Sequence, residues 1–419
     1  MELILYVLFF GAWASLIYSK NGFNISCFIV TLYLIGSIFS NCIFCFYTPY
    51  IEHPERITWL SVICHIVLLW LFMYPLVRFG NAVRADKLKL NLKALDIYSW
   101  AVAVPSLLSV LVSGFDVVQI FAFGNFLDAR MAAMGGEISN LYVSRFGVLG
   151  YIISFGPQLS FISTFLAFYY KFYLNKNNLL ANLLVVCSLS IVLNNLAITG
   201  REGLIRWIFY CASCAVFFKK YIKYKNHKLL FNVAGTFLAL IMIMFSLITS
   251  DRFEEDDYGP FFSILRYGGE QFFLFSYDFN RFFDSGYGSL AEVFPVITQQ
   301  IPEIYDINSK VYADYYLNTF STFDGTFLKE AGFWPTFALA VFSFICLSMI
   351  FWRKSKFICL SLTKLIGFLF YYEVVLLGFF YFLHIGRMTQ LSMVVYILLA
   401  WAISHSSRKL SRVKLITYA

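Results

Sequence analysis

Long uninterrupted apolar runs recur along the whole chain, and they constrain its fold more than any other feature. Most of these runs extend for about 17 to 25 residues, the length at which a helix crosses roughly 30 Å of hydrocarbon. Lipid offers the backbone no hydrogen-bond partners, so segments that span a bilayer in this way form α-helices. Only 13% of the residues are charged, against about 25% in an average globular domain, which excludes a soluble enzyme.

The runs predict an all-α polytopic membrane protein with about eleven spanning helices, within a range of about ten to twelve. The expected spans are residues 2–19, 24–46, 57–79, 98–121, 147–170, 178–198, 202–218, 229–249, 332–351, 361–384 and 388–405. We expect residues 1–419 to form a single integral membrane domain. The first run lacks the basic start of a signal peptide and is followed by Lys20, so we interpret it as a retained helix.

Lysine and arginine are unevenly divided between the predicted loops, and this division sets the expected orientation. With the C-terminus in the cytoplasm, about two thirds of the 32 basic residues lie inside, including the run 219–228. Of the 24 acidic residues, only Asp86 and Asp96 lie there. The N-terminus is then expected outside. This orientation explains the net charge of +8, so that charge gives no reason to expect nucleic-acid binding.

The nine cysteines all fall within or at the ends of expected spans, where cysteine serves as a small buried hydrophobic residue. Two pairs, Cys42 with Cys45 and Cys211 with Cys214, have a spacing found in metal sites, but no histidine or carboxylate accompanies either pair. The sequence also contains no glycine-rich phosphate loop and no dinucleotide fingerprint. We therefore expect neither a metal nor a cofactor.

Arginine predominates over lysine on the predicted outer side, whereas lysine predominates inside. The planar guanidinium suits a bidentate grip on phosphate or carboxylate. The outer arginines are therefore candidates for binding a diphosphate, although pairing with the many outer carboxylates explains them equally well. The candidates are Arg201, Arg206, Arg266, Arg281 and Arg387. We expect three of them, Arg201, Arg281 and Arg387, to converge on one outer cavity and to hold the diphosphate.

Arg201 directly precedes an expected helix start. Thr199 and Glu202 have the spacing of a capping box, which predicts a helix from about residue 202 with its N-terminus outward. The free amides and partial positive charge of such a terminus attract anions, and Arg201 would strengthen that attraction. Arg206 lies one turn further along, where an ion pair with Glu202 is the alternative to ligand contact.

Residues 250–331 form the longest connection between expected spans, and we place them outside as a large loop. Within it, residues 270–284 have helical periodicity. Glu270, Gln271, Asp278, Arg281 and Asp284 share one side, and phenylalanines occupy the other. This pattern predicts an amphipathic helix in the outer membrane interface, with its phenylalanines toward lipid or the helix bundle.

Glu373, His384 and Arg387 fall close to one line if a single helix continues through all three. A charged residue near the middle of a membrane costs about 2.5 to 3.5 kcal/mol, so we expect Glu373 to face the bundle interior with a partner. Two interpretations fit this residue equally well. One is a polar stripe that leads into the membrane from the outer surface, and the other is a structural hydrogen bond to a neighbouring helix.

The layout of the whole chain resembles the Wzy-type O-antigen polymerases, the oligosaccharide repeat-unit polymerases of bacterial surface polysaccharide synthesis. The common features are many spans, a large outer loop in the C-terminal half and outer arginines near helix starts. Residues 199–205 (Thr-Gly-Arg-Glu-Gly-Leu-Ile) are similar to the family's turn of small residues and arginine before a span. Residues 318–323 and 328–333 resemble its entry to the span that follows the large loop.

This resemblance implies an inverting, metal-independent glycosyl transfer at the outer face of the bacterial cytoplasmic (inner) membrane. A growing glycan on undecaprenyl diphosphate would be the donor, and a single lipid-linked repeat unit the acceptor. Fixed arginines would stabilise the charge that develops on the leaving diphosphate. The implied partners are undecaprenyl-diphosphate-linked glycans, the lipid bilayer, a chain-length regulator and a flippase.

The acceptor hydroxyl of such a reaction needs a base, and the outer candidates are His384, Asp278, Glu202 and Glu270. Histidine ordinarily titrates near neutral pH, which favours His384 mildly. Two other functions remain open: a lipid-linked oligosaccharide flippase or solute transporter, and an O-antigen ligase-like transferase. A carrier is expected to have polar residues through the membrane centre, whereas here the unusual residues gather at the outer face.

Overall fold

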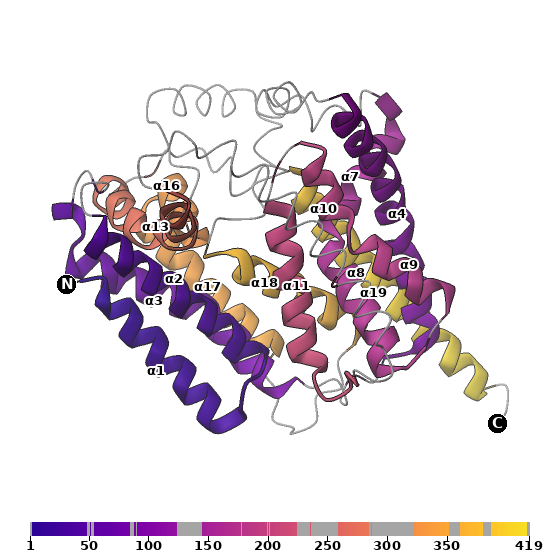
Figure 1. Cartoon of the computed structure of the whole chain (residues 1–419). Coiled ribbons are helices and arrows are strands. Elements are labelled where there is room, and N and C mark those ends of the chain that lie inside the picture. The colour runs from indigo at the N-terminus through magenta and orange to yellow at the C-terminus, as the bar shows by residue number, and fades with distance from the viewer. Residues whose placement is uncertain are drawn as a thin grey trace. The chain divides into compact units, whose positions relative to one another are not determined.

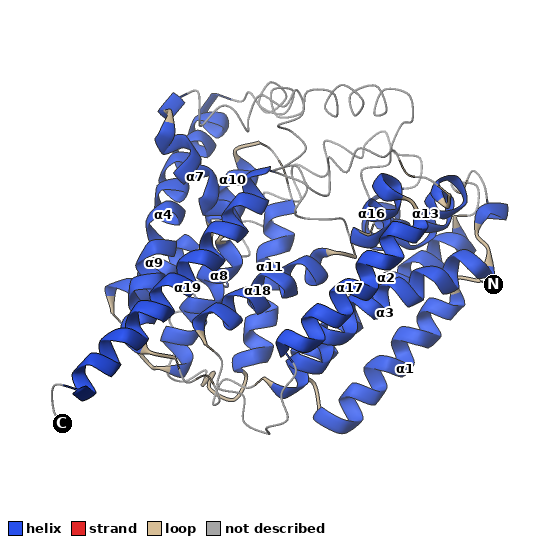
Figure 2. Cartoon of the chain, turned by 180° about the vertical axis from the view of Figure 1, so that it is seen from behind, coloured by secondary structure: helices blue, strands red, loops and turns tan. Residues whose placement is uncertain are grey.

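The computed structural model describes residues 2–47, 51, 54–83, 88, 90–123, 145–176, 178–198, 200, 202–223, 235, 259–284, 286, 322–351, 361–379 and 387–416. Every regular element in these ranges is a helix, and no strand occurs in them (Figures 1 and 2). The predicted all-α class is therefore confirmed for the described part of the chain.

Six of the described helices are long and apolar enough to cross a membrane. They are Ile25–Phe46, Trp59–Ala82, Leu92–Ile120, Leu179–Leu196, Phe333–Ile350 and Met388–Ser406. A seventh candidate is the pair Val148–Gln158 and Ser160–Tyr173, whose halves are bent by 56°. These helices support the prediction of a helical membrane protein.

Three further expected spans also coincide with helices, namely α1 (Ile4–Asn21), α11 (Glu202–Phe218) and α18 (Leu362–Leu377). Among them, α18 ends well before the predicted boundary at residue 384. The expected span 229–249 lies outside the described ranges.

The chain divides into two compact units, each described below by itself. Unit 1 consists of residues 1–84, 253–358 and 370–391, and unit 2 of residues 85–252, 359–369 and 392–419. The division falls within α18 and within α19 (Arg387–Ile416), so each of these helices contributes residues to both units.

In unit 1, α1 packs against α2 (Ile25–Phe46), α2 against α3 (Trp59–Ala82), and α3 against α17 (Phe333–Phe351). Local sequence sets the helix starts. The Asn24 side chain accepts a hydrogen bond from the Cys27 amide at 2.9 Å and so caps α2. Thr58 and Ser61 form a reciprocal capping box at the start of α3.

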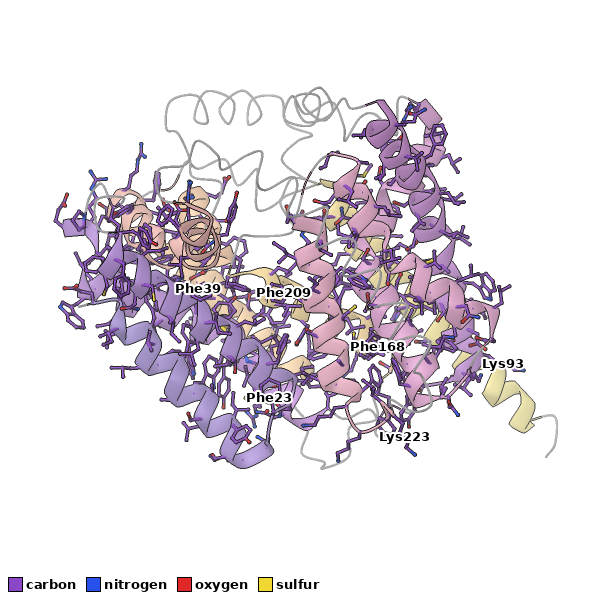
Figure 3. The ribbon with its side chains drawn as sticks, in the orientation of Figure 1. Phe23, Phe39, Lys93, Phe168, Phe209 and Lys223 are labelled. Carbon is purple, nitrogen blue, oxygen red and sulfur yellow. The ribbon has the colours of Figure 1, made fainter. Side chains whose placement is uncertain are left out.

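Two more helices, α13 (Gly259–Phe282) and α16 (Phe323–Ala331), lie together at one end of these helices (Figure 1). Glycines bring α13 very close to α2. A Cβ atom on Gly269 would lie 2.4 Å from the Ser40 amide nitrogen, and one on Gly268 would lie 2.5 Å from the ring of Phe39. Phe39 is labelled in Figure 3. Small residues at a helix contact permit this close backbone approach.

The helix predicted over 270–284 is confirmed as part of α13, which begins earlier, at Gly259. Its phenylalanines are buried in the bundle as expected. Glu270 and Gln271, on the predicted polar side of this helix, are buried as well, with exposed fractions of 3% and 0%. α13 contacts α2, α3 and α16, so helices from other segments cover it on more than one side.

Unit 2 consists mainly of α4 (Leu92–Phe123), α7 (Val148–Gln158), α8 (Ser160–Phe168), the π-helical η4 (Tyr169–Tyr173), α9 (Leu179–Cys187), α10 (Ser190–Leu196) and α11. Pro105 lies inside α4 and has no amide hydrogen for the Ala101 carbonyl one turn earlier. The Tyr396 hydroxyl of α19 donates to that carbonyl instead, at 3.0 Å.

Two breaks lie side by side in unit 2, one between α7 and α8 and the other between α9 and α10. Serine hydroxyls connect them. The Ile191 amide donates to the Ser160 hydroxyl at 3.0 Å, and the two hydroxyls of Ser160 and Ser190 are 2.7 Å apart. The Ser190 hydroxyl donates to the Gly156 carbonyl at 2.9 Å. One continuous hydrogen-bond chain thus links backbone groups at both breaks.

Candidate functional site

Three of the predicted site residues cannot be placed in this structure. Arg201 and His384 lie outside the described residues, and Arg387 begins α19 without a described side chain. The convergence of Arg201, Arg281 and Arg387 on one diphosphate therefore stays a prediction. Arg281, on α13, is exposed, and its guanidinium carbon lies 5.3 Å from the centre of the Phe282 ring.

Glu202 and Arg206 form an ion pair one turn apart at the start of α11. The helix begins at Glu202, as the capping spacing predicts. The alternative interpretation of Arg206 as the ion-pair partner of Glu202 is thus confirmed. Both residues belong to unit 2, whereas the candidates on α13 belong to unit 1.

The two acidic candidates on α13 also face cations. Arg266 Nε lies 3.0 Å from Glu270 Oε2, and Lys329 Nζ lies 3.3 Å from Asp278 Oδ2. Glu270 has an exposed fraction of only 3%. These carboxylates are held in ion pairs within the protein, so the geometry does not favour either as the base for a substrate hydroxyl.

Glu373 is buried as expected, with 3% of its surface exposed. A single helix does not continue from Glu373 to Arg387, because α18 ends at Leu377 and a turn follows, and His384 itself lies outside the described residues. The reason lies at Gly378, whose carbonyl accepts a hydrogen bond from the Phe323 amide at 2.9 Å. The Phe323 ring also packs where a Gly378 side chain would be, 2.4 Å from the position of its Cβ atom.

A polar cluster that the sequence did not predict lies inside unit 1, and we call Tyr6, His65, Thr322 and Asp324 the His65 cluster. His65 Nδ1 is 2.7 Å from the Tyr6 hydroxyl, and His65 Nε2 is 3.1 Å from the Thr322 hydroxyl. Nε2 also lies 3.4 Å from Asp324 Oδ2. All four residues have an exposed fraction of 0%.

Four helices build this cluster. Tyr6 comes from α1 and His65 from α3, while Thr322 and Asp324 lie at the start of α16. The fourth helix, α13, supplies Phe275, whose ring stacks on the imidazole with centroids 3.8 Å apart and planes 3° apart. Because the ring is stacked and bonded through both nitrogens, its orientation is fixed.

Asp324 is the unusual member of the cluster. Neither of its carboxylate oxygens has a hydrogen-bond partner among the described residues. A buried carboxylate is costly unless a counter-charge or hydrogen bonds compensate it. The nearby His65 ring supplies that charge only when it is protonated.

The Tyr6 hydroxyl also lies 3.4 Å from the Phe272 carbonyl oxygen, which is a second contact between α13 and the His65 cluster.

The described residues that flank residues 287–321 contact each other near the start of α17. The Phe333 amide donates to the Phe283 carbonyl at 3.2 Å. Gly286 packs against the backbone of Glu330, where a Cβ atom on the glycine would be 2.4 Å from the Glu330 carbonyl carbon. Residues on both sides of this long segment are therefore fixed to one site.

Sequence reasoning missed this cluster because its members come from four separate segments. The signal that could have found His65 is its place inside an apolar span, where an ionisable residue needs a partner. The predicted outer loop, residues 250–331, contains Asp324, Lys329 and Glu330, so their burial was not expected. In the part of the chain that the structure covers, no three His, Cys, Asp or Glu side chains are grouped as metal ligands.

No protein-family model matches this chain, and neither a curated protein nor a solved structure matches it.

Proposed function

We propose that this chain polymerises undecaprenyl-diphosphate-linked oligosaccharide repeat units at the outer face of the bacterial inner membrane. In the reaction, the bond between the donor sugar and the lipid diphosphate breaks, and a bond from that sugar to the acceptor oxygen forms. The acceptor hydroxyl loses its proton, and the lipid diphosphate leaves with the bonding electron pair. Arginines suit the stabilisation of that leaving group.

The observation that carries this proposal is the anchoring of the long segment between α13 and α17. Lys329 of α16 pairs with Asp278 of α13, and Phe333 of α17 bonds to Phe283 at the end of α13. The described residues on both sides of residues 287–321 are therefore held together by a buried ion pair and a backbone hydrogen bond. This favours a substrate-binding role over that of a simple linker.

Glycan length in cells tests the proposal. The gene is deleted, and the wild type or a variant is restored at matched protein levels in the membrane. We expect Arg281→Ala to reduce polymerisation by about 10² to 10³-fold, because one stabiliser of a developing charge is lost. Arg281→Lys should recover little, since ammonium lacks the planar bidentate geometry.

Arg145→Ala is the matched control, because Arg145 is another arginine of the predicted outer side whose partner is Asp116, at 3.0 Å. It should leave glycan length unchanged. A polymerase defect leaves single repeat units on the surface anchor, a flippase defect leaves none outside, and a ligase defect leaves polymer that is not attached. Polymer of normal length in cells that lack the gene would refute the proposal.

The His65 cluster favours one alternative, a proton-coupled carrier of lipid-linked oligosaccharide. Buried His and Asp residues in helical membrane proteins often form proton pathways. The test is purified protein in liposomes with a pH-sensitive dye inside and lipid-linked repeat units added outside. Substrate-dependent proton movement would favour the carrier, and its absence together with polymer formation would favour the transferase.

A further inference from the structure

We propose that one end of unit 2 binds the headgroup of an anionic phospholipid. The binding surface is a set of lysines that lie where four elements of this unit meet, and its ligand is a phosphate diester attached to acyl chains. We call this set the lysine cluster, and its members are Lys93, Lys171, Lys176, Lys219, Lys220 and Lys223. The inference does not depend on the proposed function, because it involves neither a glycan nor any residue assigned to the transfer reaction.

Contacts of η4 bring the starts of α4 and α9 together. The Tyr170 hydroxyl of η4 donates a hydrogen bond to Asp96, in the second turn of α4. The Lys171 amine donates to the Asn182 side chain, in the first turn of α9. The Lys176 amide donates to the Tyr170 carbonyl at 2.9 Å, which holds the turn after η4 against that helix. Three of the four elements are thus fixed to one another through η4.

The end of α11 joins the same place. The rings of Tyr173 and Tyr221 meet edge to face, with centroids 5.0 Å apart and planes 79° apart. Tyr221 lies in the turn that follows α11, together with Lys219 and Lys220. Figure 3 labels Lys93 and Lys223, another two members of the lysine cluster, at the lower end of unit 2 in that view.

The charges at this end have almost one sign. Residues 90–100, 168–176, 178–182 and 214–223 are described, and they contain six lysines but only one carboxylate, Asp96. Four of the lysines are exposed, and Lys171 and Lys176 are half-buried. A cluster of basic side chains at the end of membrane helices attracts anionic headgroups, with a gain in affinity of about fivefold for each lysine near the membrane surface. Charge complementarity therefore favours an anionic lipid as the occupant.

Membrane orientation alone does not explain the geometry of Lys171. The preference for lysine on one side concerns the loops between spans. Lys171 instead lies within η4 and is half-buried, and Asn182 supplies its amine with an oxygen but no charge. Tyrosines such as Tyr173 and Tyr221 are typical of the depth at which lipid headgroups lie. One amine is thus held in place beside two rings that suit this depth.

Apolar side chains next to the cluster fit the acyl chains of the same lipid. Leu179, in the first turn of α9, is 67% exposed, and Ile97 of α4 is 59% exposed. Trp100, one turn further along α4, is 43% exposed. α4 and α9 contact each other, so these residues extend the surface from the lysines along two neighbouring helices. A lipid fits both parts of this surface, whereas a free phosphate ion fits only the lysines.

Native mass spectrometry of the full-length protein in mild detergent tests the proposal. The protein is mixed with equal amounts of phosphatidylglycerol and phosphatidylcholine that have the same acyl chains. We expect the wild type to retain phosphatidylglycerol several-fold more often, because only this lipid has a net negative charge. Inorganic phosphate at the same concentration should not displace it, because the ion has no acyl chains to bury.

Two variants locate the binding surface. Lys219→Gln combined with Lys220→Gln removes two exposed charges, so the affinity for phosphatidylglycerol should fall by about 20- to 30-fold. Lys171→Met removes the amine and keeps an apolar stem, and the affinity should fall by about fivefold. Lys20→Gln is the matched control, because Lys20 is an exposed lysine at the end of α1 in unit 1. It should leave the affinity unchanged.

Equal retention of the two lipids by the wild type would overturn the proposal. So would displacement of phosphatidylglycerol by inorganic phosphate, or an equal loss of affinity in Lys20→Gln and the double variant. If Lys171→Met does not accumulate as folded protein, the double variant still decides, because both of its lysines are exposed in a turn. Glycan synthesis enters none of these measurements, so failure here is distinct from failure of the proposed function.

Discussion

The two compact units bury different kinds of polar side chain. In unit 1, ionisable side chains are buried where α16 meets its neighbours, as His65 with Asp324 and Lys329 with Asp278. In unit 2, neutral hydroxyls of Ser160 and Ser190 complete the hydrogen bonds of two broken helices. The serine chain is explained by the backbone groups that it satisfies. No break in the described helices of unit 1 requires these ionisable pairs, which indicates a role beyond packing.

The largest effect is expected at the buried ion pair of unit 1. Lys329→Met removes the cation that faces Asp278, and the two side chains are only 7% and 15% exposed. Removing one partner of a buried pair commonly costs about 3 to 5 kcal/mol, because the other charge stays buried. We expect a loss of about 3 kcal/mol in the free energy of unfolding, measured by denaturation in mixed detergent.

A double variant shows whether that loss comes from charge. Asp278→Leu combined with Lys329→Met removes both charges and keeps apolar volume, so most of the lost stability should return. If the double variant is as unstable as Lys329→Met alone, the effect comes from packing, and the contrast between charged and neutral networks would lose its main support.

The next effect concerns how closely α4 and α7 approach in unit 2. A Cβ atom on Gly156 would lie 2.4 Å from the Ser109 Cβ atom and 2.8 Å from the Pro105 carbonyl oxygen. Backbone atoms cannot move aside easily, so Gly156→Ala should cost about 1 to 3 kcal/mol in the same denaturation assay.

Gly367→Ala, within α18, is the matched control, because nothing lies within 4 Å of the added methyl group. Alanine favours a helix over glycine by up to about 1 kcal/mol, so this variant should be neutral or slightly stabilising. Equal losses in the two glycine variants would show that the glycines act through helix propensity and not through close approach.

The sequence predicted most helices because apolar length and helix caps are local signals. The start of α11 at Glu202 and its ion pair with Arg206 follow from residues within one helical turn. The burial of Glu270 could not be predicted in this way. It depends on the packing of α13 against α2, α3 and α16, which come from other parts of the chain.

The candidate site was less predictable for the same reason. His65 and Asp324 are separated by most of the chain, and neither segment contains a recognisable pattern. The predicted line from Glu373 to His384 assumed that helical periodicity continues past Gly378, where the structure has a turn held by Phe323. Periodicity predicts which residues share a helix face, but it does not predict where a distant segment ends that helix.

The smallest effects are expected at the hydrogen-bond chain through Ser160 and Ser190 in unit 2. Which of two variants loses more stability tests the direction of the hydrogen bonds in that chain. Ser160→Ala removes the acceptor of the Ile191 amide, a bond of 3.0 Å at the start of α10. That amide lies at a helix start, and burying it without a partner costs about 1 to 3 kcal/mol. We expect a loss of about 1 to 2 kcal/mol in the free energy of unfolding.

Ser190→Ala should cost less, because Ser160 lies one turn after Gly156 and its hydroxyl proton is then available for the Gly156 carbonyl. Single hydrogen bonds between membrane helices average about 0.6 kcal/mol, which is the loss we expect here. Denaturation of both variants in mixed detergent shows which of them has lost more of the free energy of unfolding. If Ser190→Ala is the more destabilising variant, the proton of Ser160 does not reach Gly156, and the break between α7 and α8 depends on α10 for its hydrogen bond. In both units the packing of a helix would then depend on one specific side chain from a distant segment. The remaining difference would be that this side chain is ionisable in unit 1 and a neutral hydroxyl in unit 2.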